Sequence, residues 1–117
     1  MLLDRSGKLV KGLDFRGTSI ELLDKLTARE LFLIMTSAQQ EVNLQRNFKA
    51  TELAPQDWSG TPYEPILTVC EGDRSTALRL FGVVIKQALI MTPLLFTQIS
   101  NDDEWEGATY IKETLKF

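Results

Sequence analysis

The sequence predicts a helix-rich α+β fold that forms a single domain over residues 1–117. Three patterns support this: residues 74–91 are almost entirely apolar, a capping motif precedes a second long helix, and both ends of the chain carry strand-like patterns. A chain of 117 residues can bury one hydrophobic core but not two. We therefore expect the two long helices to pack on a small antiparallel sheet built from the two termini. The alternative is an all-α domain with an N-terminal β-hairpin.

The N-terminal segment has the pattern of a β-hairpin. Two short apolar pairs flank the turn-forming residues 4–8, in which Gly7 is free to adopt a positive φ angle. Apolar and polar residues then alternate over residues 13–16, which is the period of a half-buried strand. We therefore expect strands within residues 1–16.

Three threonines each precede a glutamate by three residues, which is the spacing of a helix capping box. In that motif the hydroxyl accepts a bond from a free amide of the first turn, and the carboxylate accepts one from the cap's own amide. Each pair also stands before an apolar run, so each predicts the start of a helix. The pairs are Thr18 with Glu21, Thr27 with Glu30 and Thr61 with Glu64, and the predicted helices are residues 19–26, 28–48 and 62–70.

The longest of these helices has an apolar stripe at helical spacing, which we expect to face the core. Amide side chains concentrate in its second half, so that end is expected to face solvent or a partner. The stripe consists of Leu31, Met35, Ala38 and Val42, widened by Phe32 and Ile34.

Residues 74–91 form the strongest predicted element, preceded by Gly72 as a helix end and Asp73 as a cap. Polar residues occupy only a narrow strip of this helix, so it should be buried on most sides. It is then either the centre of the fold or part of a subunit interface, which makes a homodimer an expected assembly. The stripe predicted to lie deepest is Leu78, Phe81, Ile85 and Leu89.

The last part of the chain is ambiguous. Residues 93–100 alternate like a strand, and residues 108–117 are rich in β-branched and aromatic residues. The apolar residues from Trp105 to Leu115 also fit helical spacing, although Gly107 would weaken that helix. Strands are favoured because the N-terminal hairpin needs a partner to be stable.

Composition excludes several kinds of chemistry. The chain has no histidine, which removes imidazole bases and metal ligands, and its one cysteine, Cys70, can make neither an internal disulfide nor a zinc site. No glycine-rich phosphate loop or dinucleotide fingerprint is present. We therefore expect no enzyme activity, no cofactor and no metal.

Charge and hydropathy narrow the partners and the location. The net charge of −3 disfavours binding to nucleic acid. The longest apolar stretch, residues 77–99, contains Arg79 and Lys86, which does not suit a membrane span. No signal peptide pattern opens the chain, so a cytoplasmic protein is expected.

These exclusions favour a small non-catalytic interaction protein of the inhibitor, immunity or adaptor type, acting on a protein partner. The acidic excess of the second half of the chain suits a basic partner. Aromatic residues near carboxylates are frequent anchors of such surfaces, although aromatics in a loop can equally pin the loop to the core. The predicted partner surface is Asp102, Asp103, Glu104, Trp105 and Glu106, together with Trp58 and Tyr63.

The alternative function is a small-molecule binding domain. In that case an apolar pocket should lie between the sheet and the apolar helix, with a few polar groups in its wall.

Overall fold

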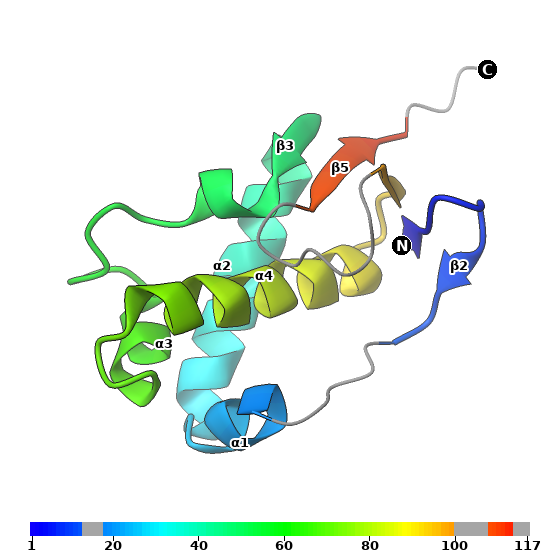
Figure 1. Ribbon diagram of the computed structural model, residues 1–117. Helices are drawn as coiled ribbons and strands as arrows, with labels where there is room; N and C mark the ends of the chain where they lie inside the picture. Colours follow the sequence, from blue (N-terminus) through cyan, green and yellow to red (C-terminus); the bar gives the residue numbers. More distant parts are fainter. Residues whose placement is uncertain (13–17, 100–107, 114–117) are drawn as a thin grey trace.

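The computed structural model describes residues 1–12, 18–99 and 108–113, and it confirms the α+β fold class (Figure 1). Four α-helices and one 3-10 helix pack beside a five-stranded sheet in the described part of the chain. In chain order the elements are β1 (Leu2–Leu3), β2 (Leu9–Val10), α1 (Thr18–Asp24), α2 (Ala28–Leu44), β3 (Asn47–Lys49), η1 (Ala50–Leu53), α3 (Glu64–Val69), α4 (Arg74–Met91), β4 (Phe96–Gln98) and β5 (Thr109–Lys112).

The sheet is mixed, with strand order β2-β1-β4-β5-β3. Strand β1 pairs antiparallel with β2 and parallel with β4, whereas β5 pairs antiparallel with both β4 and β3. The expected antiparallel sheet from the two termini was therefore wrong in two respects: the β1–β4 pair is parallel, and β3 comes from the middle of the chain. All the described helices lie between β1 and β4 in the sequence, and such a long crossover allows two strands to run in the same direction.

Both termini contribute strands, as predicted. In the hairpin, the Asp4 carboxylate accepts bonds from the amides of Ser6 and Lys8, each at 2.9 Å, and Gly7 adopts a φ angle of 84°. Strands β4 and β5 decide between the two readings of the C-terminal part, and the all-α alternative is wrong. The strand pattern predicted at residues 13–16 lies outside the described residues.

Helix α2 ends earlier than predicted, at Leu44 rather than near residue 48. Residues 47–49 instead form strand β3 at the edge of the sheet, where Phe48 pairs with Tyr110. Phe48 is buried while its two neighbours are exposed, which is the alternation of a strand. In the sheet its ring is only 2% exposed and packs against the rings of Phe96 and Tyr110.

The two short helices also differ from their predicted bounds. Helix α1 ends at Asp24, two residues early, and α3 begins at Glu64 rather than at residue 62. The third threonine pair does not form a capping box: the Thr61 hydroxyl donates to the Trp58 carbonyl, and the Glu64 carboxylate accepts from the Gly60 amide. These bonds stabilise the turn before α3 instead of its first helical amides.

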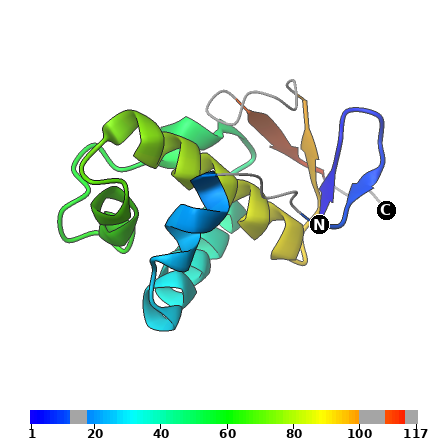
Figure 2. The same cartoon turned by 60° about the horizontal axis from the view of Figure 1, so that its bottom comes forward.

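Helix α4 has the predicted bounds, and the Asp73 carboxylate caps it by accepting from the amides of Ser75 and Thr76. Helices α2 and α3 and the 3-10 helix η1 cover it within the same chain, and the sheet lies beside these helices (Figure 2). Most of the apolar surface of α4 is therefore buried without a second copy. Phe81, Ile85 and Leu89 are fully buried, whereas Leu78 is only partly buried. No helix among the described residues is long and apolar enough to span a membrane.

The N-terminus of α2 carries the predicted capping box. The Thr27 hydroxyl accepts from the Glu30 amide at 3.0 Å, and the Glu30 carboxylate accepts from the Thr27 amide at 2.9 Å. Thr27→Ala is expected to lower the free energy of unfolding by about 1 kcal/mol, because an amide of the first turn loses its acceptor. Urea unfolding measures this loss. Thr27→Ser keeps the hydroxyl and should match the wild type, and equal midpoints for all three proteins would contradict the cap's contribution.

Candidate functional site

Two of the residues predicted to bind a partner lie in the core. The side chains of Trp58 and Tyr63 are only 4% and 3% exposed. Both rings pack edge-on against Phe81 of α4, with ring centroids 6.0 Å and 5.0 Å away. They hold the loop of residues 54–63, which contains Pro55 and Pro62, on the helix, so they offer almost no surface to a partner. The physical reason is area, because burying a large ring under a long loop stabilises the fold more than leaving it in water.

Tyr63 also joins this loop to α2 through a polar contact. Its hydroxyl donates to the Glu41 carboxylate at 3.1 Å. Burial raises the pKa of Tyr63, and the nearby Glu41 charge raises it further. Burial likewise raises the pKa of Glu41, while the Tyr63 bond opposes that shift. The pair is a structural link whose carboxyl group has lost part of its hydration.

This link makes stability depend on pH. Because the pKa of Glu41 is raised, the folded protein holds that proton more tightly than the unfolded chain. The stability that this tighter proton binding adds is fully present below the pKa that Glu41 has in the unfolded chain. It is lost as the pH rises through the higher pKa that Glu41 has in the folded protein. Glu41→Gln keeps an acceptor for Tyr63 without the charge, so it should melt at a higher temperature than wild type at pH 7 and at a similar temperature at pH 4.

Thermal unfolding at the two pH values checks this expectation. The exposed Glu52 provides a matched control, because Glu52→Gln removes the same charge away from Tyr63. The proposed cause is wrong if Glu52→Gln shifts the pH dependence as much as Glu41→Gln does.

The other predicted partner residues, Asp102, Asp103, Glu104, Trp105 and Glu106, lie outside the described residues. Cys70 is buried; that burial raises the pKa of its thiol, and the charge of Asp73 acts in the same direction. A thiol in this setting is a poor nucleophile at neutral pH. Within residues 1–12, 18–99 and 108–113, no three potential ligands of the His, Cys, Asp or Glu type are placed to hold a metal ion.

The most unusual surface lies on the first turns of α2. Phe32 is 68% exposed and Leu33 is 48% exposed, and Leu31 beside them also reaches solvent. The stripe predicted to face the core was therefore partly wrong: the fully buried positions of α2 are Ile34, Ala38 and Val42. We call Leu31, Phe32 and Leu33 the α2 ridge.

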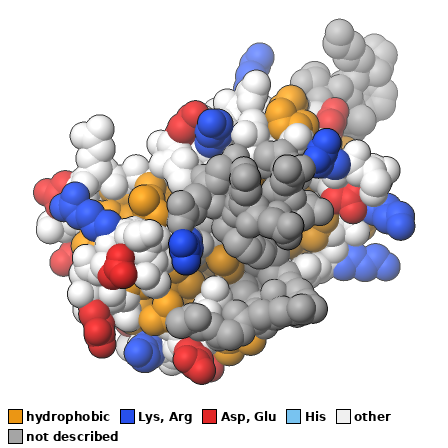
Figure 3. Space-filling view, in the orientation of Figure 1, with side chains coloured by type: hydrophobic (Ala, Val, Ile, Leu, Met, Phe, Trp, Pro, Cys, Tyr) orange, Lys and Arg blue, Asp and Glu red, His pale blue; other side chains and the backbone are white. Residues whose placement is uncertain are grey.

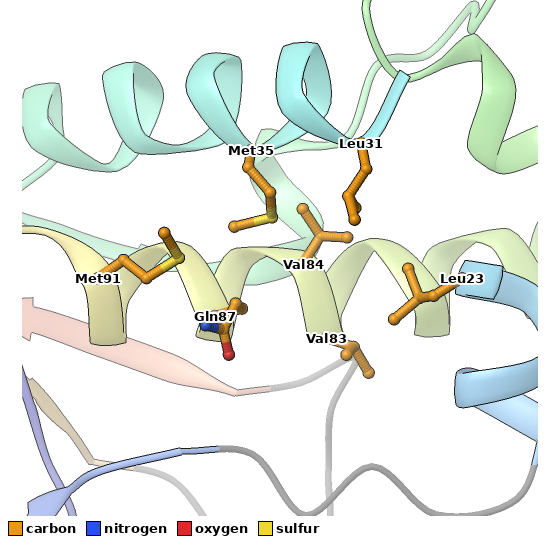
Figure 4. A pocket seen from close by; sticks show the side chains of 7 residues that line it. All are labelled: Leu23, Leu31, Met35, Val83, Val84, Gln87 and Met91. Atoms are coloured by element: carbon orange, nitrogen blue, oxygen red, sulfur yellow. The ribbon is translucent and has the colours of Figure 1, made fainter. Parts of the chain in front are cut away.

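An apolar groove runs along one side of the α2 ridge, between α2 and α4, and α1 closes one end. Leu31 and Met35 project from α2 toward α4, and Val84 projects from α4 between them (Figure 4). The groove has a volume of about 370 Å³. It lies among helices rather than between sheet and helix, where the sequence had placed a pocket. Its lining residues are Leu23, Leu31, Met35, Val83, Val84, Gln87 and Met91.

A second groove, the charged groove, lies on the other side of the ridge, between the N-terminal part of α2 and helix α3 with the turn that precedes it. Its volume is about 510 Å³, and Leu33 contributes to its wall. It combines apolar side chains with two carboxylates and one ammonium group. Its lining residues are Lys25, Glu30, Leu33, Thr61, Pro62, Glu64, Pro65, Thr68 and Val69.

Most of the described charged residues fall into two regions; Glu41, Glu52, Asp57, Arg79 and Lys86 belong to neither. The sheet end is mostly cationic, and the helices around the charged groove are mostly acidic; Figure 3 shows carboxylates beside exposed apolar side chains over these helices. The sheet-end cations are Arg5, Lys8, Lys11, Arg46, Lys49 and Lys112, beside Asp4 and Glu113. The helical end carries Glu21, Asp24, Glu30, Glu64, Glu71 and Asp73, beside Lys25, Arg29 and Arg74.

Comparison with protein families, curated proteins and solved structures finds no match for this chain. The function is therefore inferred from the geometry of the α2 ridge and the two grooves. An apolar ridge between an apolar groove and a polar one offers binding surface. The described residues of these grooves do not bring together a nucleophile and a base.

One pattern in the sequence does point to the ridge. Residues 31–35 are five consecutive apolar residues within a helix. Successive residues of a helix turn by about 100°, so such a run covers the whole circumference and cannot all face one core. Some of these side chains must therefore be exposed or covered by a partner.

Proposed function

We propose that this protein is a small non-catalytic binding module, of the inhibitor, immunity or adaptor type, that recognises another protein through the α2 ridge. The observation that carries the proposal is the exposure of Phe32, at 68%, between two grooves. An aromatic side chain left in water contributes little to folding and lowers solubility. A binding role accounts for its position.

The shape of this surface also supports a protein partner. Phe32 is the most exposed residue of the ridge, while Leu31 and Leu33 lead from it into the apolar groove and the charged groove. Aromatic side chains at the centre of a contact, surrounded by residues that exclude water, contribute most to binding energy. A partner that covers Phe32 would bring its neighbouring side chains over both grooves at once.

The available side chains support a role without catalysis. The chain has no histidine, and Cys70 is buried. The carboxylates of Glu30 and Glu64 each accept a bond from a backbone amide, so both are committed in part to the fold. Binding through shape, apolar contact and charge uses what this surface offers.

Affinity capture from an extract of the producing cells tests the proposal with a matched pair of variants. Phe32→Ser should lose a protein that the wild type retains, because the central apolar contact is removed. Leu44→Ser is the control: Leu44 is 82% exposed but lies at the far end of the same helix. If both variants retain the same proteins as the wild type, the ridge is not the binding surface.

A second candidate function is the binding of a small apolar ligand in the apolar groove. The volume of about 370 Å³ falls in the range of small-ligand sites, and Gln87 provides one polar group in the lining. Titration with octanol, followed by the methyl NMR signals of Leu23 and Met35, tests this candidate. Saturable shifts confined to groove residues support it, and uniform small shifts across the protein contradict it.

A further inference from the structure

We propose that the partner of the α2 ridge presents a cationic amphipathic segment, whose apolar side chains cover Phe32 and enter the apolar groove while its Lys or Arg side chains contact Glu30 and Glu64. This inference rests on the proposed function and adds the chemistry of the partner. Three observations carry it: the division of polarity across the ridge, the free carboxylate oxygens, and the acidic surroundings.

The two sides of the ridge differ sharply in polarity. Among the described residues, none that lines the groove faced by Leu31 is charged, whereas Leu33 faces a groove that contains Glu30, Glu64 and Lys25. A segment lying across Phe32 therefore meets an apolar surface on one side and a charged surface on the other. An amphipathic segment has this same division along its length.

The carboxylates of the charged groove retain binding capacity. Glu30 uses Oε1 to accept from the Thr27 amide, and Glu64 uses Oε2 to accept from the Gly60 amide. Within the part of the chain that the structure describes, the second oxygen of each carboxylate accepts no hydrogen bond and forms no ion pair. Each carboxylate is held in place by its backbone bond, which reduces the entropy lost when a cation binds. Lys25 balances only one of the two charges.

The charge around the groove selects a basic partner over a second copy of the chain. Two-fold pairing through the ridge would bring the acidic helical ends of two copies together, and like charges across an interface are unfavourable. A cationic segment finds complementary charge on the same surface. Carboxylates around the groove, such as Glu21 on α1 and Glu71 in the turn after α3, extend this attraction and would mainly raise the association rate.

The test uses two labelled model peptides of equal length, one of leucine and lysine and one of leucine and glutamate, with binding measured by fluorescence anisotropy. The wild type should bind the lysine peptide and not the glutamate peptide. Phe32→Ser should weaken binding at least tenfold, as loss of a central aromatic contact does. The double variant Glu30→Gln, Glu64→Gln should weaken it about three- to tenfold at low salt, and less at high salt.

The charge variants are designed to leave the fold intact. Glutamine at either position can still accept the bond from Thr27 or Gly60, because a glutamine side chain also has a carbonyl oxygen. The matched control, Glu52→Gln with Glu113→Gln, removes the same net charge at exposed positions near the sheet, away from both grooves, and should bind within twofold of the wild type.

Several results would overturn the cationic partner. These are equal binding of the two peptides, no binding of the lysine peptide at millimolar concentration, or an equal loss in the control double variant. Sedimentation of the protein alone tests whether a second copy of the chain binds the ridge instead. Self-association that Phe32→Ser abolishes would assign the ridge to that second copy. If capture from extract depends on Phe32 but not on Glu30 and Glu64, the proposed function stands and the cationic partner does not.

Discussion

Phe81→Ala is expected to lower the free energy of unfolding by about 3–5 kcal/mol. Phe81 is fully buried in α4, and the rings of Trp58 and Tyr63 rest edge-on against it. Removing the ring leaves a cavity and takes away the surface on which the loop before α3 packs. Because a domain of this size is stable by about 5–15 kcal/mol, the variant should lose a large share of its stability.

Urea unfolding followed by circular dichroism measures this effect. Phe81→Leu keeps much of the volume and should lose less stability than Phe81→Ala. Leu44→Ala, at an exposed position of α2, should change stability by less than about 0.5 kcal/mol. An unchanged midpoint for Phe81→Ala would show that this ring is not at the centre of the core.

Trp58→Ala is expected to destabilise the protein by a similar amount, about 3–5 kcal/mol. The indole is 4% exposed and packs at right angles to Phe81, at a centroid distance of 6.0 Å and an interplanar angle of 87°. The prediction separates a structural role from a binding role for Trp58. A partner anchor exposed on the surface would cost little stability when removed, so a loss below about 0.5 kcal/mol would return Trp58 to the candidate binding residues.

A double-mutant cycle with Phe81→Ala and Trp58→Ala then measures their contact directly. An edge-to-face aromatic pair contributes about 0.5–1.5 kcal/mol beyond the area it buries, so the two losses should not be additive. A second cycle with Leu89→Ala and Trp58→Ala is the comparison: Leu89 is fully buried on the same helix, but a leucine cannot form an aromatic ring contact with Trp58. Additive losses in both cycles would contradict a specific contact between the two rings.

The candidate site was much harder to predict than the fold. The acidic excess of the sequence favoured a basic partner. In the structure, the carboxylates of the charged groove are those of Glu30 and Glu64. Trp58 and Tyr63, the aromatic residues predicted to bind the partner, are buried in the core instead. Composition shows that aromatic and acidic residues exist, not which of them the core will cover. A large ring in a loop is buried or exposed according to whether a helix lies under that loop, and this contact joins residues far apart in the chain.

The features that could be predicted from the amino-acid sequence are those that depend on neighbours within a few positions. Helix α4 and its Asp73 cap, the capping box of Thr27 and Glu30, and the turn at Gly7 all follow from such local contacts. The hydrogen bonds of a helix cap and the backbone geometry of a turn are formed by residues close in sequence, so they do not depend on where the helix or hairpin packs in the fold. Their bounds could therefore be predicted without knowing the rest of the fold.

The pairing of strands and the exposure of α2 depend on long-range contacts, so they could not be predicted from local sequence patterns. Strand β3 exists because Phe48 meets Tyr110 across the sheet, and β1 runs parallel to β4 because the intervening helices form the crossover between them. Helical periodicity likewise fixes the angle between Leu31 and Phe32 but not which of them is covered. That depends on where α1 and α4 pack, because burial is a property of distant surfaces that meet in space rather than of neighbours along the chain.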